Sequence, residues 1–126
     1  MPQDAQDLKV WQRAIDLTVC VYRLTQKFPK EETYGLISQL RRASVSVASN
    51  IAEGRGRLNT GEFRQFLGVA LGSIFEVKTQ LIVARRLEMA KPVAIDEATS
   101  LSEEVSKMLT SFIQTLSSRP GHRAES

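Results

Sequence analysis

Between residues 63 and 84, apolar side chains recur at alternating spacings of four and three positions. They are Phe63, Leu67, Ala70, Ile74, Val77, Leu81 and Ala84. In an α-helix this spacing places all of them on one face, which other helices must cover. The pattern predicts a long helix from Thr60, its expected N-cap, to about Glu88.

An earlier amphipathic segment runs from about Leu8 to Lys27. Asp4 or Asp7 can cap this helix, and Phe28-Pro29 ends it because proline lacks a backbone donor and restricts the residue before it. Its apolar residues form two seams. The first seam is Val10, Ala14, Leu17, Val21, Leu24 and Phe28, and the second is Leu8, Trp11, Ile15, Val19 and Tyr22.

Two further helices complete the pattern. One runs from about Tyr34 to Glu53 after a Thr33 cap, and the glycines at 54 and 56 suit a left-handed terminus. The other is expected to begin at Asp96. Because the connections are short, we predict an all-α, up-down-up-down antiparallel four-helix bundle over residues 1–117, followed by a flexible C-terminal tail over residues 118–126.

The fourth helix also carries two seams. They are Ala98, Leu101, Val105, Met108 and Phe112, beside Leu109, Ile113 and Leu116. Apolar width beyond one stripe either leaves a surface for another subunit or widens one core face, and the pattern favours neither. We take a homo-oligomer as the working expectation.

Residue types that usually carry catalysis are sparse. The only histidine, His122, lies in the expected tail, and Cys20 sits between two valines, where a thiol fills the core and reacts poorly. The sequence has no Glu-x-x-His pair, the ligand set typical of di-iron bundles. The acidic residues at 96, 97, 103 and 104 suit the start of a helix. We predict no catalytic residue, no metal, no cofactor and no small-molecule substrate.

The cysteine count, the start of the sequence and the length of its uncharged segments indicate where in the cell the protein is expected. One cysteine cannot form an internal disulfide, and Met-Pro-Gln-Asp-Ala-Gln-Asp at the start has no apolar run, so we expect no secretion signal and a cytoplasmic protein. The longest segment without charge, residues 65–75, is too short to cross a bilayer. We therefore expect no membrane partner.

Small residues predict close helix packing at two places. On the second helix, Ser44, Ser46, Ala48 and Ser49 leave little side-chain bulk, so a neighbouring helix can approach closely. On the third helix, the glycines at 68 and 72 have a Gly-x-x-x-Gly spacing, which also permits close approach of a helix.

Asn50, Glu53 and Gly54 form a candidate structural motif at the end of the second helix. A carboxylate is disfavoured at a helix C-terminus, so Glu53 should have a cationic partner. The neighbouring arginines favour an ion pair within or between subunits. A catalytic carboxylate is the less favoured alternative.

Positive charge is concentrated between residues 41 and 64. Five arginines there, against Glu53 and Glu62, give a local balance equal to the whole chain's formal net charge of +3. Arginine offers a planar fork for phosphate, so this segment is a candidate RNA or single-stranded DNA interface. Its residues are Arg41, Arg42, Arg55, Arg57 and Arg64.

Several short runs together resemble the four-helix bundle family encoded in intervening sequences of bacterial 23S ribosomal RNA genes. The resemblance covers about residues 7 to 90 and is most specific in Asn50-Ile51-Ala52-Glu53-Gly54. The other runs are Leu8-Lys9-Val10-Trp11-Gln12, Tyr22-Arg23-Leu24-Thr25 with Phe28-Pro29, Tyr34-Gly35-Leu36, Gln39-Leu40-Arg41-Arg42-Ala43, Glu62-Phe63 with Phe66-Leu67, Ala70, and Gly72-Ser73.

The resemblance implies a small bacterial bundle that assembles as a homopentameric barrel. It does not imply membership of the ribosome. A related branch is the accessory protein of diversity-generating retroelements, which binds nucleic acid and a reverse transcriptase. Our chain differs from this basic branch in the degree of its charge, which is only +3 per subunit and hence +15 for five copies. We therefore expect a non-enzymatic, oligomeric interaction scaffold, with RNA or DNA binding, and a reverse transcriptase as partner, as the alternative.

Overall fold

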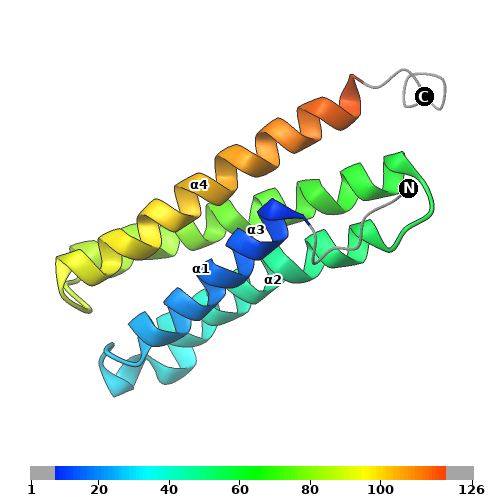
Figure 1. Cartoon of the computed structure of the whole chain (residues 1–126). Coiled ribbons are helices and arrows are strands. Elements are labelled where there is room, and N and C mark those ends of the chain that lie inside the picture. Colours follow the sequence, from blue (N-terminus) through cyan, green and yellow to red (C-terminus); the bar gives the residue numbers. More distant parts are fainter. Residues whose placement is uncertain (1–7, 119–126) are drawn as a thin grey trace.

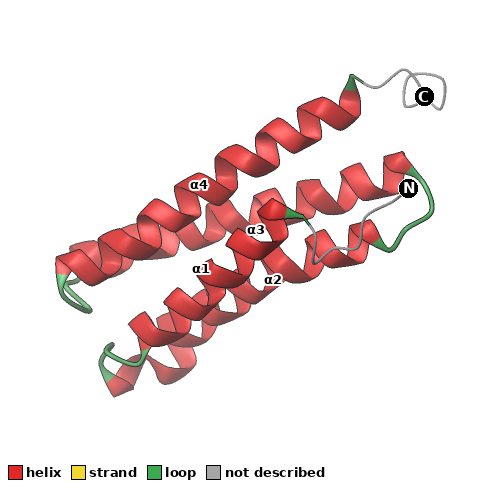
Figure 2. Cartoon of the chain, in the orientation of Figure 1, coloured by secondary structure: helices red, strands yellow, loops and turns green. Residues whose placement is uncertain are grey.

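The computed structural model describes residues 8–118 and consists of four long helices (Figures 1 and 2). They are α1 (Lys9–Thr25), α2 (Ser38–Arg55), α3 (Thr60–Arg86) and α4 (Pro92–Ser117). Each helix packs on its neighbours in the chain, and α1 also packs on α4, so that α1 lies diagonally across the bundle from α3. The predicted up-down-up-down four-helix bundle is confirmed.

The core is formed by the seams that the spacing identified. All of the α3 seam except the half-buried Phe63 is buried, and so is the complete first seam of α1. Leu40, Val47 and Ile51 supply the apolar edge of α2. The predicted tail, apart from Ser118, lies outside the described residues, as does His122.

The predicted starts of α3 and α4 differ from the structure, whereas α1 starts near Leu8 as expected. The N-cap of α3 is Asn59 and not Thr60, because the Asn59 carboxamide oxygen accepts the Glu62 N–H at 2.8 Å. α4 begins at Pro92 rather than at Asp96; a proline at the first helical position sacrifices no hydrogen bond. α1 begins after Leu8 with no side-chain cap, and Asp4 and Asp7 lie outside the described residues.

The connection between α1 and α2 is more structured than the sequence suggested. A short 3₁₀ turn, Lys30–Glu32, leads into a wide turn, Thr33–Ile37, before α2 begins. Thr33 was the expected cap, but its hydroxyl donates to the Lys30 carbonyl at 2.7 Å. The Glu32 carboxylate accepts the Leu36 N–H instead, at 3.2 Å.

Gly54 is needed for close packing and not for a left-handed terminus. Neither Gly54 nor Gly56 has a positive φ. A Cβ built at Gly54 would lie 2.7 Å from the Cβ of Phe66 and 3.2 Å from the carbonyl oxygen of Phe63. α2 and α3 therefore meet at a point where no side chain fits.

The small residues of α2 allow the expected close approach of neighbouring helices. The Thr18 hydroxyl of α1 reaches the Ser44 carbonyl at 3.1 Å, and on the α3 side the Ser46 and Ser73 hydroxyls lie 2.8 Å apart. The corresponding expectation for α3 was wrong within one chain. Gly68 and Gly72 are exposed, and nothing lies within 4 Å of a Cβ added at either position.

The second seams of α1 and α4 differ in how far they are buried. In α4, Leu109 and Leu116 are buried and Ile113 is half-buried, so this seam widens the core face. In α1, Ile15, Val19 and Tyr22 are 37%, 42% and 40% exposed. This part of the second α1 seam therefore stays on the surface of the subunit, whereas Leu8 and Trp11 are half-buried against the core.

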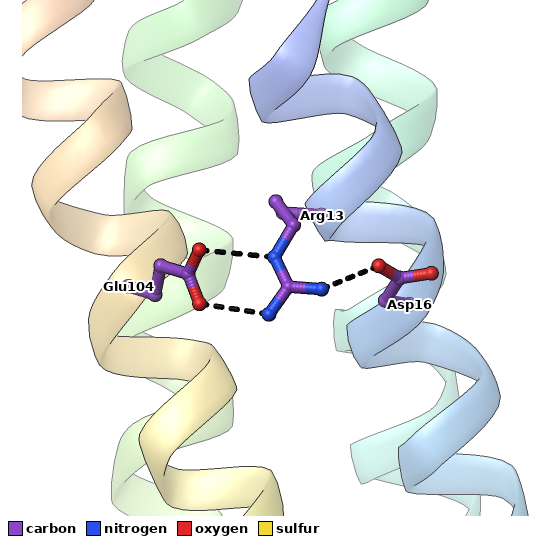
Figure 3. Close-up of polar contacts among 3 residues, drawn as sticks. All are labelled: Arg13, Asp16 and Glu104. Atoms are coloured by element: carbon purple, nitrogen blue, oxygen red, sulfur yellow. Dashed lines mark hydrogen bonds and ion pairs between the residues drawn. The ribbon is translucent and has the colours of Figure 1, made fainter.

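An arginine clamp holds α1 to α4 (Figure 3). Arg13 donates from Nε and Nη2 to the two carboxylate oxygens of Glu104, at 3.0 and 2.8 Å, and from Nη1 to Asp16 at 2.6 Å. These hydrogen bonds lower the pKa of Glu104, because they favour its charged form. The bidentate geometry fixes how α4 lies along α1.

α3 is, by length and composition, apolar enough to cross a membrane, and it is alone in this among the described helices. In its most apolar window, 39% of the residues are buried inside the bundle. Long core helices commonly meet the same criterion, so this property carries little weight.

Replacing Gly54 by alanine should destabilise the bundle. The added Cβ meets the backbone-anchored Phe66 Cβ, and the overpacking should outweigh the helix propensity gained, for a net loss of about 1–2 kcal/mol. Gly56→Ala is the matched control, because its Cβ would have no neighbour closer than 3.6 Å. Urea unfolding at one protein concentration measures both. Equal stability of the two variants would contradict the packing argument.

Candidate functional site

The turn between α2 and α3 brings arginines and phenylalanines together. Because Gly54 lets the helices meet, the guanidinium carbon of Arg57 lies 4.8 Å from the ring centroid of Phe66. The guanidinium carbon of Arg55 lies 5.9 Å from the ring centroid of Phe63. Such cation–π stacking restrains the guanidinium groups while leaving their N–H edges available.

Glu53 has the cationic partner that its position requires. Its carboxylate pairs with Arg57 at 2.8 Å, across the end of α2. The two side chains are 55% and 42% exposed, so the pair is solvated and contributes little to stability. Within this turn, Arg57 thus stacks on a ring and pairs with a carboxylate at the same time.

The predicted arginines form two groups rather than one cluster. Arg64 is half-buried in the first turns of α3, near Arg55 and Arg57 in the chain. Arg41 lies at the other end of α2, about 21 Å from Arg55 along the helix. Its guanidinium stacks on Tyr22 at 4.5 Å and donates to the Thr25 hydroxyl at 2.8 Å. Arg42 beside it is exposed.

Asn50 belongs to a polar joint between α2 and α3. Its side-chain nitrogen donates to the Ser46 carbonyl at 2.8 Å and to the Ser46 hydroxyl at 3.0 Å. The Ser46 hydroxyl in turn meets Ser73 of α3 at 2.8 Å. Asn50, Glu53 and Gly54 are thus all used in the approach of α2 to α3 and in the turn that follows.

The role of the phenylalanines in this turn was not predicted from the sequence. Phe63 was assigned to the α3 seam, yet it is half-buried between Arg55 and Phe112, whose ring meets it edge-on at 5.4 Å. Leu58, at the tip of the turn, is fully exposed. Ring–arginine pairs separated by eight or nine residues across a turn leave no helical period to detect.

The described residues offer little for metal or thiol chemistry. No group of three or more His, Cys, Asp or Glu side chains could hold a metal ion within residues 8–118. Cys20, expected in the core, is only half-buried and lies near the Glu97 carboxylate of α4. Partial burial raises the pKa of its thiol.

Glu53→Ala should cost less than about 1 kcal/mol of unfolding free energy, because the pair with Arg57 is exposed. A double-mutant cycle with Arg57→Ala, measured by urea unfolding, should give a coupling of about 0.3–0.5 kcal/mol. Glu103→Ala, an exposed carboxylate with no ion pair among the described residues, is the control. A coupling several times larger would indicate that another subunit buries the pair.

Comparisons with known proteins place the fold. The sequence pattern of the 23S rRNA-intervening sequence proteins matches residues 6–111. A crystal structure of a protein of unknown function from the S23 ribosomal protein family of Bacteroides thetaiotaomicron is similar, with a TM-score of 0.77 and 23% identity over 82% of this chain and 97% of that one. No curated protein matches. The chain belongs to the family of 23S rRNA-intervening sequence proteins.

Proposed function

We propose that the protein is a homo-oligomeric interaction scaffold whose subunits join through two different apolar faces. The first is the outer face of α3. Val69, Phe75 and Ile82 are 49%, 53% and 54% exposed there, and Val83 is 41% exposed. The exposed Gly68 and Gly72 leave open space between them. An apolar surface of this extent is typical of a protein–protein interface.

The second face lies on α1 and α2. It contains the exposed part of the second α1 seam together with Val45 of α2, which is 40% exposed. Arg41, stacked on Tyr22, lies within this face. We call it the α1–α2 face, and the other the α3 face.

The arrangement of these faces favours a ring over a two-fold dimer. α1 lies diagonally across the bundle from α3, so their outer surfaces point in opposite directions. Contact between unlike, opposed faces is heterologous, and it generates a closed ring when the rotation between subunits allows. The resemblance to pentameric barrels supplies the number five.

Charged residues beside the two faces also favour contact between the α1–α2 face of one subunit and the α3 face of another. Arg42 borders the α1–α2 face and Glu76 lies on the outer side of α3; both are exposed. Neither forms an ion pair within residues 8–118. In a heterologous contact these opposite charges would complement one another and help to set the register.

Light scattering should give a mass several times 14.1 kDa, the mass of one chain, and most simply five times. Val45→Glu and Ile82→Glu each place a charge in one face, at residues exposed enough to leave the fold intact, and each should yield monomers. Val93→Glu, at an exposed α4 position outside both faces, is the control.

Mixing the two monomeric variants provides the sharper measurement. Each retains one intact face, so an equimolar mixture should form a one-to-one complex that cannot grow further. A mixture that remains monomeric would contradict the heterologous contact. A monomeric parent protein would contradict self-association altogether.

Nucleic-acid binding is the second candidate function, and the stacked arginines of the α2–α3 turn favour it. Arg55 and Arg57 rest on aromatic rings, which positions their guanidinium edges for phosphate before any contact is made. Repetition around an oligomer would place several such pairs along one strand. The ion pair between Glu53 and Arg57 weakens this site, so we rank it second.

Binding to a labelled single-stranded oligonucleotide should be weak, independent of sequence, and steeply reduced by salt, because each contacted phosphate releases counterions. Fluorescence anisotropy should show that Arg55→Ala/Arg57→Ala abolishes it. Arg23→Ala/Arg86→Ala removes the same charge at exposed residues elsewhere and should preserve most of it. Equal loss in both variants would indicate that net charge, and not the turn, carries the binding.

A further inference from the structure

A cleft between α1 and α4 lies outside the α3 face and the α2–α3 turn, and of the exposed apolar residues that define the α1–α2 face it shares Val19 alone. Its volume is about 520 Å³, which is within the range of small-molecule sites. Val19, Leu24, Ala94 and Leu101 provide apolar walls. The two helices contact one another elsewhere along their length, so the cleft is a local widening of the α1–α4 seam.

Two side-chain contacts define how α1 and α4 are aligned on the two sides of this cleft. Arg13 of α1 contacts Glu104 of α4, and Cys20 of α1 contacts Glu97 of α4. From the first contact to the second, the chain advances about two helical turns along α1 and goes back about two turns along α4. The antiparallel register therefore places Asp16 near Leu101 at one end. Arg23 and Lys27 lie near the start of α4 at the other end. The cleft is about 16 Å long by this register.

Its two ends differ in charge. The Asp16 carboxylate is already paired with Arg13, and Glu97 lies in the middle beside Cys20. Arg23 and Lys27 form no ion pair within the described chain. No acidic residue occupies the first turn of α4, so the positive end of its dipole adds to these two cations.

We infer that this cleft binds an amphipathic organic anion, of the class of medium-chain carboxylates. The carboxylate lies between Arg23 and Lys27, and the hydrocarbon chain follows Leu24, Ala94 and Val19 toward Leu101. Glu97 repels an anion from the middle of the cleft, which sets this orientation. The inference does not rest on the proposed scaffold function, although Val19 also belongs to the α1–α2 face. It runs against our expectation from the sequence, which was that the protein takes no small-molecule substrate.

Cys20 provides a reporter inside the cleft. It is the only cysteine of the chain, it lines the cleft, and it is half-buried. An occupant that covers it should slow its alkylation. Since removal of nearby cations also alters the thiolate fraction, each variant is compared with itself, with and without the added compound.

The experiment measures the rate of Cys20 alkylation by N-ethylmaleimide, by mass spectrometry of the intact protein. Octanoate, octanol and octylammonium are added at equal concentrations below micelle formation. Octanoate should slow alkylation in a saturable way, and octylammonium should leave it unchanged. For Arg23→Ala/Lys27→Ala, half-protection should need at least about tenfold more octanoate. Arg86→Ala/Lys107→Ala removes the same charge at exposed residues outside the cleft and should behave as the parent.

Protection by all three compounds alike would overturn the inference, because it would show an unselective apolar surface. Unchanged octanoate protection in Arg23→Ala/Lys27→Ala, or no protection in the parent, would overturn it as well. Light scattering on the same samples records the oligomeric state. If octanoate does not bind but the oligomer is intact, this inference fails and the scaffold proposal stands. If octanoate binds to a monomeric protein, the scaffold proposal fails and this inference stands.

Discussion

The close approach of α2 to α3 is the constraint on which the remaining surface depends. It requires a position without a side chain at Gly54 and hydroxyls small enough to meet at Ser46 and Ser73. Once the helices are this close, the first turns of α3 lie against the end of α2. Phe63 and Phe66 then lie beneath the arginines of the turn.

The exposed apolar faces follow from how the remaining helices are used. α3 buries one continuous seam and also exposes Val69, Phe75, Ile82 and Val83 on its outer side, where a solvated helix would normally be polar. α1 buries its first seam completely, and of its second seam Leu8 and Trp11 pack against the core while Ile15, Val19 and Tyr22 stay exposed. Both helices therefore carry more apolar surface than one bundle uses, and they carry it on opposite sides.

Helical period made the core predictable, whereas single-residue geometry did not. Every residue of the α3 seam except the half-buried Phe63 is buried as the spacing predicted, because burial of one face must repeat with the turn of the helix. Helix starts were misassigned, because Asn59 and Thr60 are both acceptable caps and only the backbone path decides between them. The role of Gly54 could not be predicted either, since it depends on Phe66 of another helix.

The order of the helices also has a consequence for how the bundle opens. Three of its helix–helix seams join neighbours in the chain, and α1–α4 joins its two ends, so closing that seam carries the largest loss of chain entropy. The polar contacts across it include the exposed Arg13 clamp and the weak Cys20–Glu97 contact, and a cleft interrupts its packing. Amide hydrogens along this edge should therefore exchange through local opening, while those of the α2–α3 pair exchange only when the whole domain unfolds.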